Sequence, residues 1–181
     1  MRVVAGELRG RRLIAPEGLD TRPTTDRVRE AIFNSLSSMD LVMDAAYADL
    51  FAGTGALGIE ALSRGAAHCT FVERDGRALR ALRANIDALG LASRSTVIPA
   101  DAVAAMSRLP TVDVVVADPP YGFVDWTSLL ERLPAELAVV ESGTELPEPP
   151  LGWRTVRSRR YGRTFVTVLA RTGSGEAGEL S

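Results

Sequence analysis

One stretch, residues 49–58, constrains the fold of this chain more than any other. An apolar run over residues 45–51 predicts a buried strand, and the apolar spacing over 56–63 predicts a helix. Glycines at the turn between them match the pattern G-x-G-x-x-G, at Gly53, Gly55 and Gly58. The combination predicts an α/β fold with a ligand site, because glycine lets a ligand approach the backbone and a helix N-terminus presents free N–H groups.

A second predicted strand covers residues 69–72 and ends at Glu73, which lies 20 residues after Gly53. A carboxylate at this position accepts hydrogen bonds from the hydroxyls of a ribose. The pattern therefore predicts a cofactor that contains a nucleoside. By itself it suits NAD as well as S-adenosylmethionine.

The rest of the chain alternates between helices and strands. Helices are predicted at 76–89, 103–109 and 126–133, and strands at 96–98, 112–117 and 137–140. Residues 153–156 and 164–169 predict an antiparallel hairpin with a basic tip at 159–163. The predicted fold class is therefore α/β, a Rossmann-like, doubly wound and mostly parallel sheet with an antiparallel hairpin at its C-terminal end. Ligand groups are expected at the carboxyl ends of the strands, at Gly53, Glu73, Asp101 and Asp118.

The two ends of the chain extend this sheet. Residues 2–15 predict a small β-hairpin, and residues 26–39 predict an amphipathic helix with three candidate N-caps, Thr24, Thr25 and Asp26. The last residues are small and polar, so we expect them to be disordered. The expected organisation is a basic hairpin at 1–20, a main domain at 21–171 and a tail at 172–181.

Charge narrows the choice of partner. The 181 residues have a net charge of −2, but all 21 basic residues are arginine and 12 of them lie in the segments 1–29 and 153–163. If the two segments meet on one face, they form a footprint for nucleic acid. The candidate contacts are Arg2, Arg9, Arg11, Arg12, Arg22, Thr24, Arg27, Arg159, Arg160, Tyr161 and Arg163.

Composition disfavours several other classes of protein. The sequence has no apolar run long enough to span a membrane, and its start lacks the long apolar region of a signal peptide. Cys69 and His68 are the only residues of their kinds, which argues against an internal disulfide and a structural metal. We expect a cytoplasmic monomer.

The chemically decisive motif is Asp118-Pro119-Pro120-Tyr121, which directly follows the apolar strand at 112–117. The two prolines end the strand and fix a rigid loop. The Asp118 carboxylate and the Pro119 carbonyl are both acceptors, so together they can hold the two hydrogens of an exocyclic amine and free its lone pair to attack a methyl group. Tyr121 offers a ring on which the base can stack. These four residues are the predicted catalytic group, and the motif favours S-adenosylmethionine over NAD.

Together the glycine loop and this motif resemble those of S-adenosylmethionine-dependent amino-methyltransferases. The chain as a whole is similar to the RsmD-type 16S ribosomal RNA (guanine-N2) methyltransferases over residues 1 to about 171. The segments that carry the likeness, in the order of the family, are 1–6, 9–11, 22–30, 55–64 and 118–121. The resemblance implies methylation of guanine 966 of the small-subunit RNA on an assembling 30S particle. The cofactor-binding residues predicted with it are Asp49, Phe51, Gly53, Thr54, Gly55, Glu73, Arg74, Asp101 and Ala102.

Three other functions stay open from the residues. A DNA adenine-N6 or cytosine-N4 methyltransferase also uses Asp-Pro-Pro-Tyr, although few residues here lie outside the core to recognise a DNA target. A non-catalytic RNA-binding assembly factor on the same scaffold would share the basic ends but would not need the acceptor pair or Glu73. An NAD-binding protein is the third alternative, and the sequence offers no nicotinamide chemistry to support it.

Overall fold

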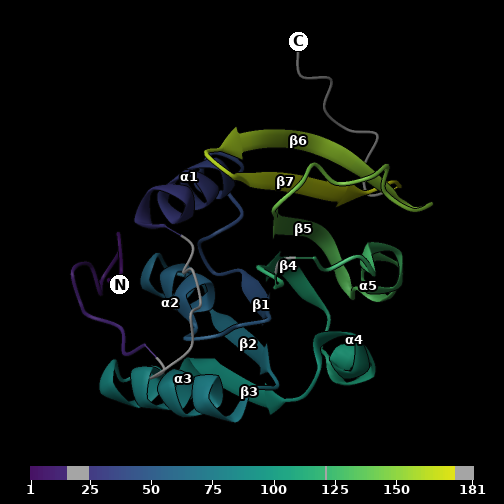
Figure 1. Cartoon of the computed structure of the whole chain (residues 1–181). Coiled ribbons are helices and arrows are strands. Elements are labelled where there is room, and N and C mark those ends of the chain that lie inside the picture. Colours follow the sequence, from purple (N-terminus) through teal and green to yellow (C-terminus); the bar gives the residue numbers. More distant parts are fainter. Residues whose placement is uncertain (16–24, 121, 174–181) are drawn as a thin grey trace.

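The computed structural model describes residues 1–15, 25–120 and 122–173, and its seven strands form one mixed sheet (Figure 1). The strands are β1 (Ala46–Leu50), β2 (His68–Glu73), β3 (Ser95–Pro99), β4 (Val112–Ala117), β5 (Ala135–Ser142), β6 (Trp153–Tyr161) and β7 (Thr164–Arg171). Their order is β3-β2-β1-β4-β5-β7-β6. The first five are parallel, and β7 pairs antiparallel with both β5 and β6. The predicted fold class is confirmed.

Helices cover both faces of the sheet. Within the described residues they are α1 (Asp26–Ser37), α2 (Ala56–Ser63), α3 (Gly76–Ala88), α4 (Ala102–Ala105) and α5 (Trp126–Arg132). In Figure 1, α1, α2 and α3 lie on one side of the sheet and α4 and α5 on the other. Alternate strand residues enter two separate cores, so Tyr47 packs toward α2 while its neighbour Ala48 packs toward α4 and α5. Burial on both faces explains the apolar run of β4 over residues 114–117, which follows the exposed Asp113.

The structure corrects the predicted helix at 103–109 and the predicted C-terminal hairpin. The helix predicted at 103–109 is one α-helical turn, α4, followed by a 3₁₀ turn over Met106–Arg108. The C-terminal strands are longer than predicted, and Arg159, Arg160 and Tyr161 belong to β6 rather than to the tip. The tip itself is the pair Gly162 and Arg163. Because β6 is an edge strand with charged side chains along it, its sequence lacks the apolar alternation that identifies a half-buried strand.

The N-terminal segment, which was predicted to form a hairpin, packs on α2 and α3. Its predicted strands are reduced to a single antiparallel bridge between Arg2 and Arg12. The Leu8 N–H donates to the hydroxyl of Ser63 at 3.0 Å, and the Ile14 N–H donates to the side chain of Asn85 at 2.7 Å. Residues 16–20 of the predicted hairpin and 174–181 of the predicted tail lie outside the described residues.

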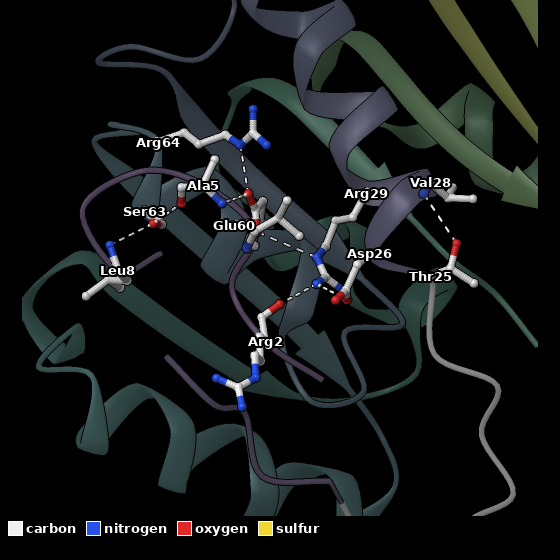
Figure 2. Close-up of polar contacts among 12 residues, drawn as sticks. Arg2, Ala5, Leu8, Thr25, Asp26, Val28, Arg29, Glu60, Ser63 and Arg64 are labelled. Carbon is white, nitrogen blue, oxygen red and sulfur yellow. Dashed lines mark hydrogen bonds and ion pairs between the residues drawn. The ribbon is translucent and has the colours of Figure 1, made fainter. Parts of the chain in front are cut away.

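A buried ion pair ties this segment to both α1 and α2 (Figure 2). Arg29 and Glu60 are both fully buried, with Nε and Oε2 at 3.6 Å. Arg29 also donates to Asp26 and to the carbonyl of Arg2. Glu60 accepts the N–H groups of Val4 and Ala5 at 2.8 and 2.9 Å. One carboxylate therefore holds the N-terminal segment, the start of α1 and the middle of α2 in place.

Replacing Glu60 with alanine is expected to lower the free energy of unfolding by about 3–5 kcal/mol, because it removes the buried carboxylate that pairs with Arg29 and accepts the N–H groups of Val4 and Ala5. Urea unfolding measures the change. Glu131→Ala, which removes an exposed carboxylate from α5, is the matched control and should change stability by less than about 0.5 kcal/mol. Similar effects of the two substitutions would show that the buried pair does not organise the fold.

Candidate active site

The glycines of the loop between β1 and α2 serve different purposes. A Cβ at Gly55 would lie 2.5 Å from Leu82 Cδ1, and one at Gly58 would lie 2.6 Å from Cys69 Sγ. The lack of a side chain at these two positions therefore allows α2 to pack closely against α3 and β2. Gly53 shares a positive φ with Gly55 (+56° and +82°), but a Cβ on it would meet only the Phe51 carbonyl oxygen, at 4.0 Å, so a ligand can approach its backbone. Phe51 also has a positive φ, +61°, which is unusual for an aromatic residue.

The Glu73 carboxylate fixes this loop against the end of β2. Its Oε2 accepts the Gly53 N–H at 2.8 Å, and its Oε1 accepts the N–H groups of Arg74 and Asp75, both at 2.7 Å. An ionised carboxylate has about four acceptor positions, so it can still accept a ligand hydroxyl. The carboxylate of Glu73 and the backbone of Gly53 therefore lie side by side at the end of β1 and β2.

Asp49 lies beneath the loop rather than at its surface. It is 1% exposed, and its Oδ2 accepts the Gly58 N–H at 2.9 Å. Burial raises the pKa of Asp49 to about 8, and the negative charges of Asp118 and Glu73 act in the same direction. The hydrogen bond from Gly58 only partly offsets the cost of burying the charge. Asp49 therefore anchors the start of α2 to β1.

Two more predicted cofactor residues form an ion pair at the same edge of the sheet. Arg74, which directly follows β2, places Nη1 3.0 Å from Oδ2 of Asp101, which follows β3. The other oxygen of Asp101 caps α4 by accepting the Val103 N–H at 3.0 Å. Ala102 is buried at the start of that helix. The carbonyl of Thr54 accepts the Asn85 amide at 3.0 Å, so the loop is also held from the α3 side.

Aromatic side chains connect the glycine loop to the Asp118 loop. The rings of Phe51 and Phe123 are 5.3 Å apart, and those of Phe123 and Trp126 are 4.9 Å apart, both in edge-to-face geometry. Neither Phe123 nor Trp126 was among the predicted site residues. Their signal in the sequence is only their closeness to the Asp-Pro-Pro-Tyr motif, two and five residues after its tyrosine.

A cavity of about 700 Å³ opens beside Asp118, Pro119 and Pro120. Its wall includes Thr25 and Val28 from the start of α1, Glu141 from the end of β5, and the β6–β7 turn. Glu141 was not predicted, although it ends a buried strand in the same way that Asp118 follows one. Ala117 pairs with Val140, so Asp118 and Glu141 follow paired residues on neighbouring parallel strands. The predicted residues Tyr121, Arg22 and Thr24 lie outside the described residues.

The structure separates the predicted RNA-binding residues into two groups. Arg27, Arg159, Arg160, Tyr161 and Arg163 belong to α1 and the β6–β7 hairpin, the elements that meet at the cavity. Arg2, Arg9, Arg11 and Arg12 belong to the segment that packs on α2 and α3. Within that segment, Arg2 donates to Gly10 and Arg11 donates to the last residue of α3, Ala88. The cavity wall, among the described residues, contains none of these four.

Within the described part of the chain, no helix is long and apolar enough to cross a membrane. The same residues contain no group of three or more histidine, cysteine, aspartate or glutamate side chains placed to hold a metal ion.

The sheet order, the glycine loop and the Asp-Pro-Pro loop beside it define a Rossmann-like methyltransferase fold. A family model described as Conserved hypothetical protein 95 matches residues 1–170. Ribosomal RNA small subunit methyltransferase D of Escherichia coli K12 is 37% identical over 98% of this chain and 93% of that protein. The protein of the same name from Haemophilus influenzae is 38% identical over 68% of this chain and 65% of its own length. The chain belongs to this family, the RsmD family.

Solved structures agree with this assignment. The E. coli protein yhhF superposes with a TM-score of 0.82 and 36% identity over 94% of this chain and 97% of its own. A hypothetical protein from Thermus thermophilus gives a TM-score of 0.77 and 30% identity over 95% of this chain and 99% of its own.

Asp49→Asn is expected to stabilise the protein increasingly as the pH rises from about 4 to about 8. The pKa of Asp49 rises from 3.8 to about 8 on folding, so folding favours the protonated acid and its advantage is lost as the pH passes through 8. Asparagine retains the acceptor for Gly58 and does not ionise. Urea unfolding of both proteins across this range measures the difference. Asp87→Asn, at an exposed position of α3, should show no such trend. A pH-independent difference for Asp49→Asn would contradict the assignment.

Proposed function

We propose that this protein transfers a methyl group from S-adenosylmethionine to the exocyclic N2 amine of a guanine in 16S ribosomal RNA. The observation that carries the proposal is the placement of the Asp118 loop. It opens into a cavity of about 700 Å³, and the contact of Phe51 with Phe123 connects it to the loop of Gly53 and Glu73. An acceptor pair for an amine thus lies next to the loop expected to hold a methyl donor.

The cofactor side of the site uses the carboxyl ends of β1, β2 and β3. We infer that Gly53 approaches the methionine part through its backbone, that Glu73 accepts the ribose hydroxyls, and that Asp101 lies by the adenine amine. When bound there, S-adenosylmethionine supplies a methyl group whose bond to a positively charged sulfur breaks as the bond to the amine nitrogen forms. Asp49, Thr54 and Gly55 shape the loop from beneath.

The substrate side of the site polarises the amine. The Asp118 carboxylate and the Pro119 carbonyl accept the two N2 hydrogens, which turns the nitrogen lone pair out of conjugation with the ring. As the nitrogen gains the methyl group it becomes positive, and the same acceptors stabilise that charge. One N2 proton then leaves toward Asp118, which restores a neutral secondary amine. Pro120 keeps the loop rigid, and we assign Tyr121 to stacking on the base.

Glu141 gives the proposed site a preference for guanine. The Watson–Crick edge of guanine presents its N1–H next to the N2 amine, so it needs acceptors at two adjacent positions. Glu141 is 4% exposed, lines the cavity and lies on the strand next to that of Asp118. Adenine has an acceptor at N1 instead of an N–H, so it cannot donate a hydrogen bond to this carboxylate.

The relatives support ribosomal RNA as the substrate. The E. coli and H. influenzae proteins are named ribosomal RNA small subunit methyltransferase D. We therefore infer that the partner is 16S RNA in the small subunit or its assembly intermediate, in the cytoplasm, and that the modified base is the guanine 966 implied by the resemblance.

Asp118→Ala is expected to reduce methyl transfer by about a hundredfold or more, on the order of the effect of removing one transition-state hydrogen bond from other enzymes. The assay is transfer of labelled methyl to small subunits that lack native modification, with duplex DNA in parallel. Calorimetry should give an almost unchanged dissociation constant for S-adenosylmethionine. Asp87→Ala is the matched surface control. Full activity of Asp118→Ala would exclude the mechanism, and label on DNA would make DNA the principal substrate.

Glu141→Gln is expected to reduce the discrimination between guanine and 2-aminopurine at the target position. Both bases carry the 2-amine, but 2-aminopurine has no N1–H, and a glutamine amide can donate to its N1. The two RNAs are mixed and compete for the enzyme, which gives the ratio of their kcat/KM values. This ratio is measured with the wild type and with the variant. A purely structural role for Glu141 would lower both rates by the same factor and leave the ratio unchanged.

A further inference from the structure

A second hollow of about 310 Å³ lies between α1 and the strands β5, β6 and β7. One wall is the exposed side of α1, with Asn34, Ser35 and Ser38. The opposite wall is one face of β6, with Arg157, Arg159 and Tyr161. No carboxylate lines this groove, among the described residues. In Figure 1, α1 runs beside β6 and β7 at the edge of the sheet.

The two arginines of the groove are available to a partner. Arg157 and Arg159 are exposed, and within the described part of the chain neither side chain has a hydrogen bond or an ion pair. They are alternate residues of a strand, so their side chains leave the same face about 6.8 Å apart. An extended polynucleotide backbone can follow such a row of cations.

The groove is amphipathic and continues into the candidate active site. Its floor includes the buried apolar residues Ile32, Val139, Val166 and Val168. This floor is rigid because its residues belong to the core, and the cationic wall suits phosphates. Tyr161 lines both this groove and the larger cavity of Asp118, so the two hollows meet at this residue.

We propose that this groove holds the single strand of RNA that adjoins the target nucleotide. The strand passes the ring of Tyr161 on leaving the cavity, and its phosphates contact Arg157 and Arg159. A groove of this size has room for an unpaired strand and not for a duplex. The substrate must therefore be unpaired beside its target base. The proposal rests on the proposed function for the position of the target, but the groove can be tested for RNA binding without any methyl transfer.

The test is the salt dependence of binding. Each phosphate contact with a single strand contributes about 0.7 to the slope of log K against log salt, so two contacts contribute about 1.4. The double variant Arg157→Ala/Arg159→Ala should therefore bind a short single-stranded RNA, of the sequence around the target guanine, with a slope that is smaller by this amount. Fluorescence anisotropy at several salt concentrations, with the intact chain, measures it. Duplex RNA of the same sequence should show no such change.

The control is Arg83→Ala/Arg132→Ala, which removes the same charge from exposed positions of α3 and α5. Its slope should match that of the wild type. Equal slopes for the groove variant and this control would overturn the groove proposal. So would an equal loss with duplex RNA, which would indicate non-specific attraction. If the slope changes as expected but the wild type transfers no methyl group to small subunits, the proposed function fails while the groove stands.

Discussion

The close approach of α2 to the sheet is the constraint on which the rest of the structure depends. At Gly55 and Gly58 a Cβ would overlap with Leu82, Phe71 or Cys69, so neither position can carry a larger side chain without a shift. That approach places the Gly58 N–H on the buried carboxylate of Asp49 and starts the helix directly above β1. Two residues further along, the same helix places Glu60 beside Arg29. The cofactor loop and the N-terminal segment are therefore positioned by one helix.

The sheet order explains why the two loops of the candidate site are neighbours. The chain runs outward from β1 through β2 to β3, then crosses back to place β4 on the other side of β1. Right-handed crossovers in opposite directions put α2 and α3 on one face and α4 and α5 on the other. A crevice opens where the direction changes, at the carboxyl ends of β1 and β4. Leu50 pairs with Ala117 there, so the glycine loop and the Asp118 loop emerge side by side.

Local patterns made much of this predictable from the sequence. The bounds of α2 and β4 follow from apolar spacing, and the placement of Glu73 follows from its distance to Gly53. Contacts between distant segments left no such signal. Nothing near Glu60 or Asn85 in the sequence indicates that their side chains hold the backbone of residues 4, 5 and 14. The edge strand β6 was predicted too short because arginines stand at its exposed positions, so its sequence does not alternate between apolar and polar residues.

Acidic side chains at the ends of the strands play unequal parts in the site. Glu73 fixes the loop through hydrogen bonds from three backbone N–H groups. Asp49 has almost no exposed surface and folds most readily as the neutral acid, so it adds little negative charge near neutral pH. A neutral acid at this position limits the negative charge beneath the loop, next to the carboxylates of Glu73 and Asp118. A buried acid beneath the loop thus keeps the charge of the site on the residues that face the cavity.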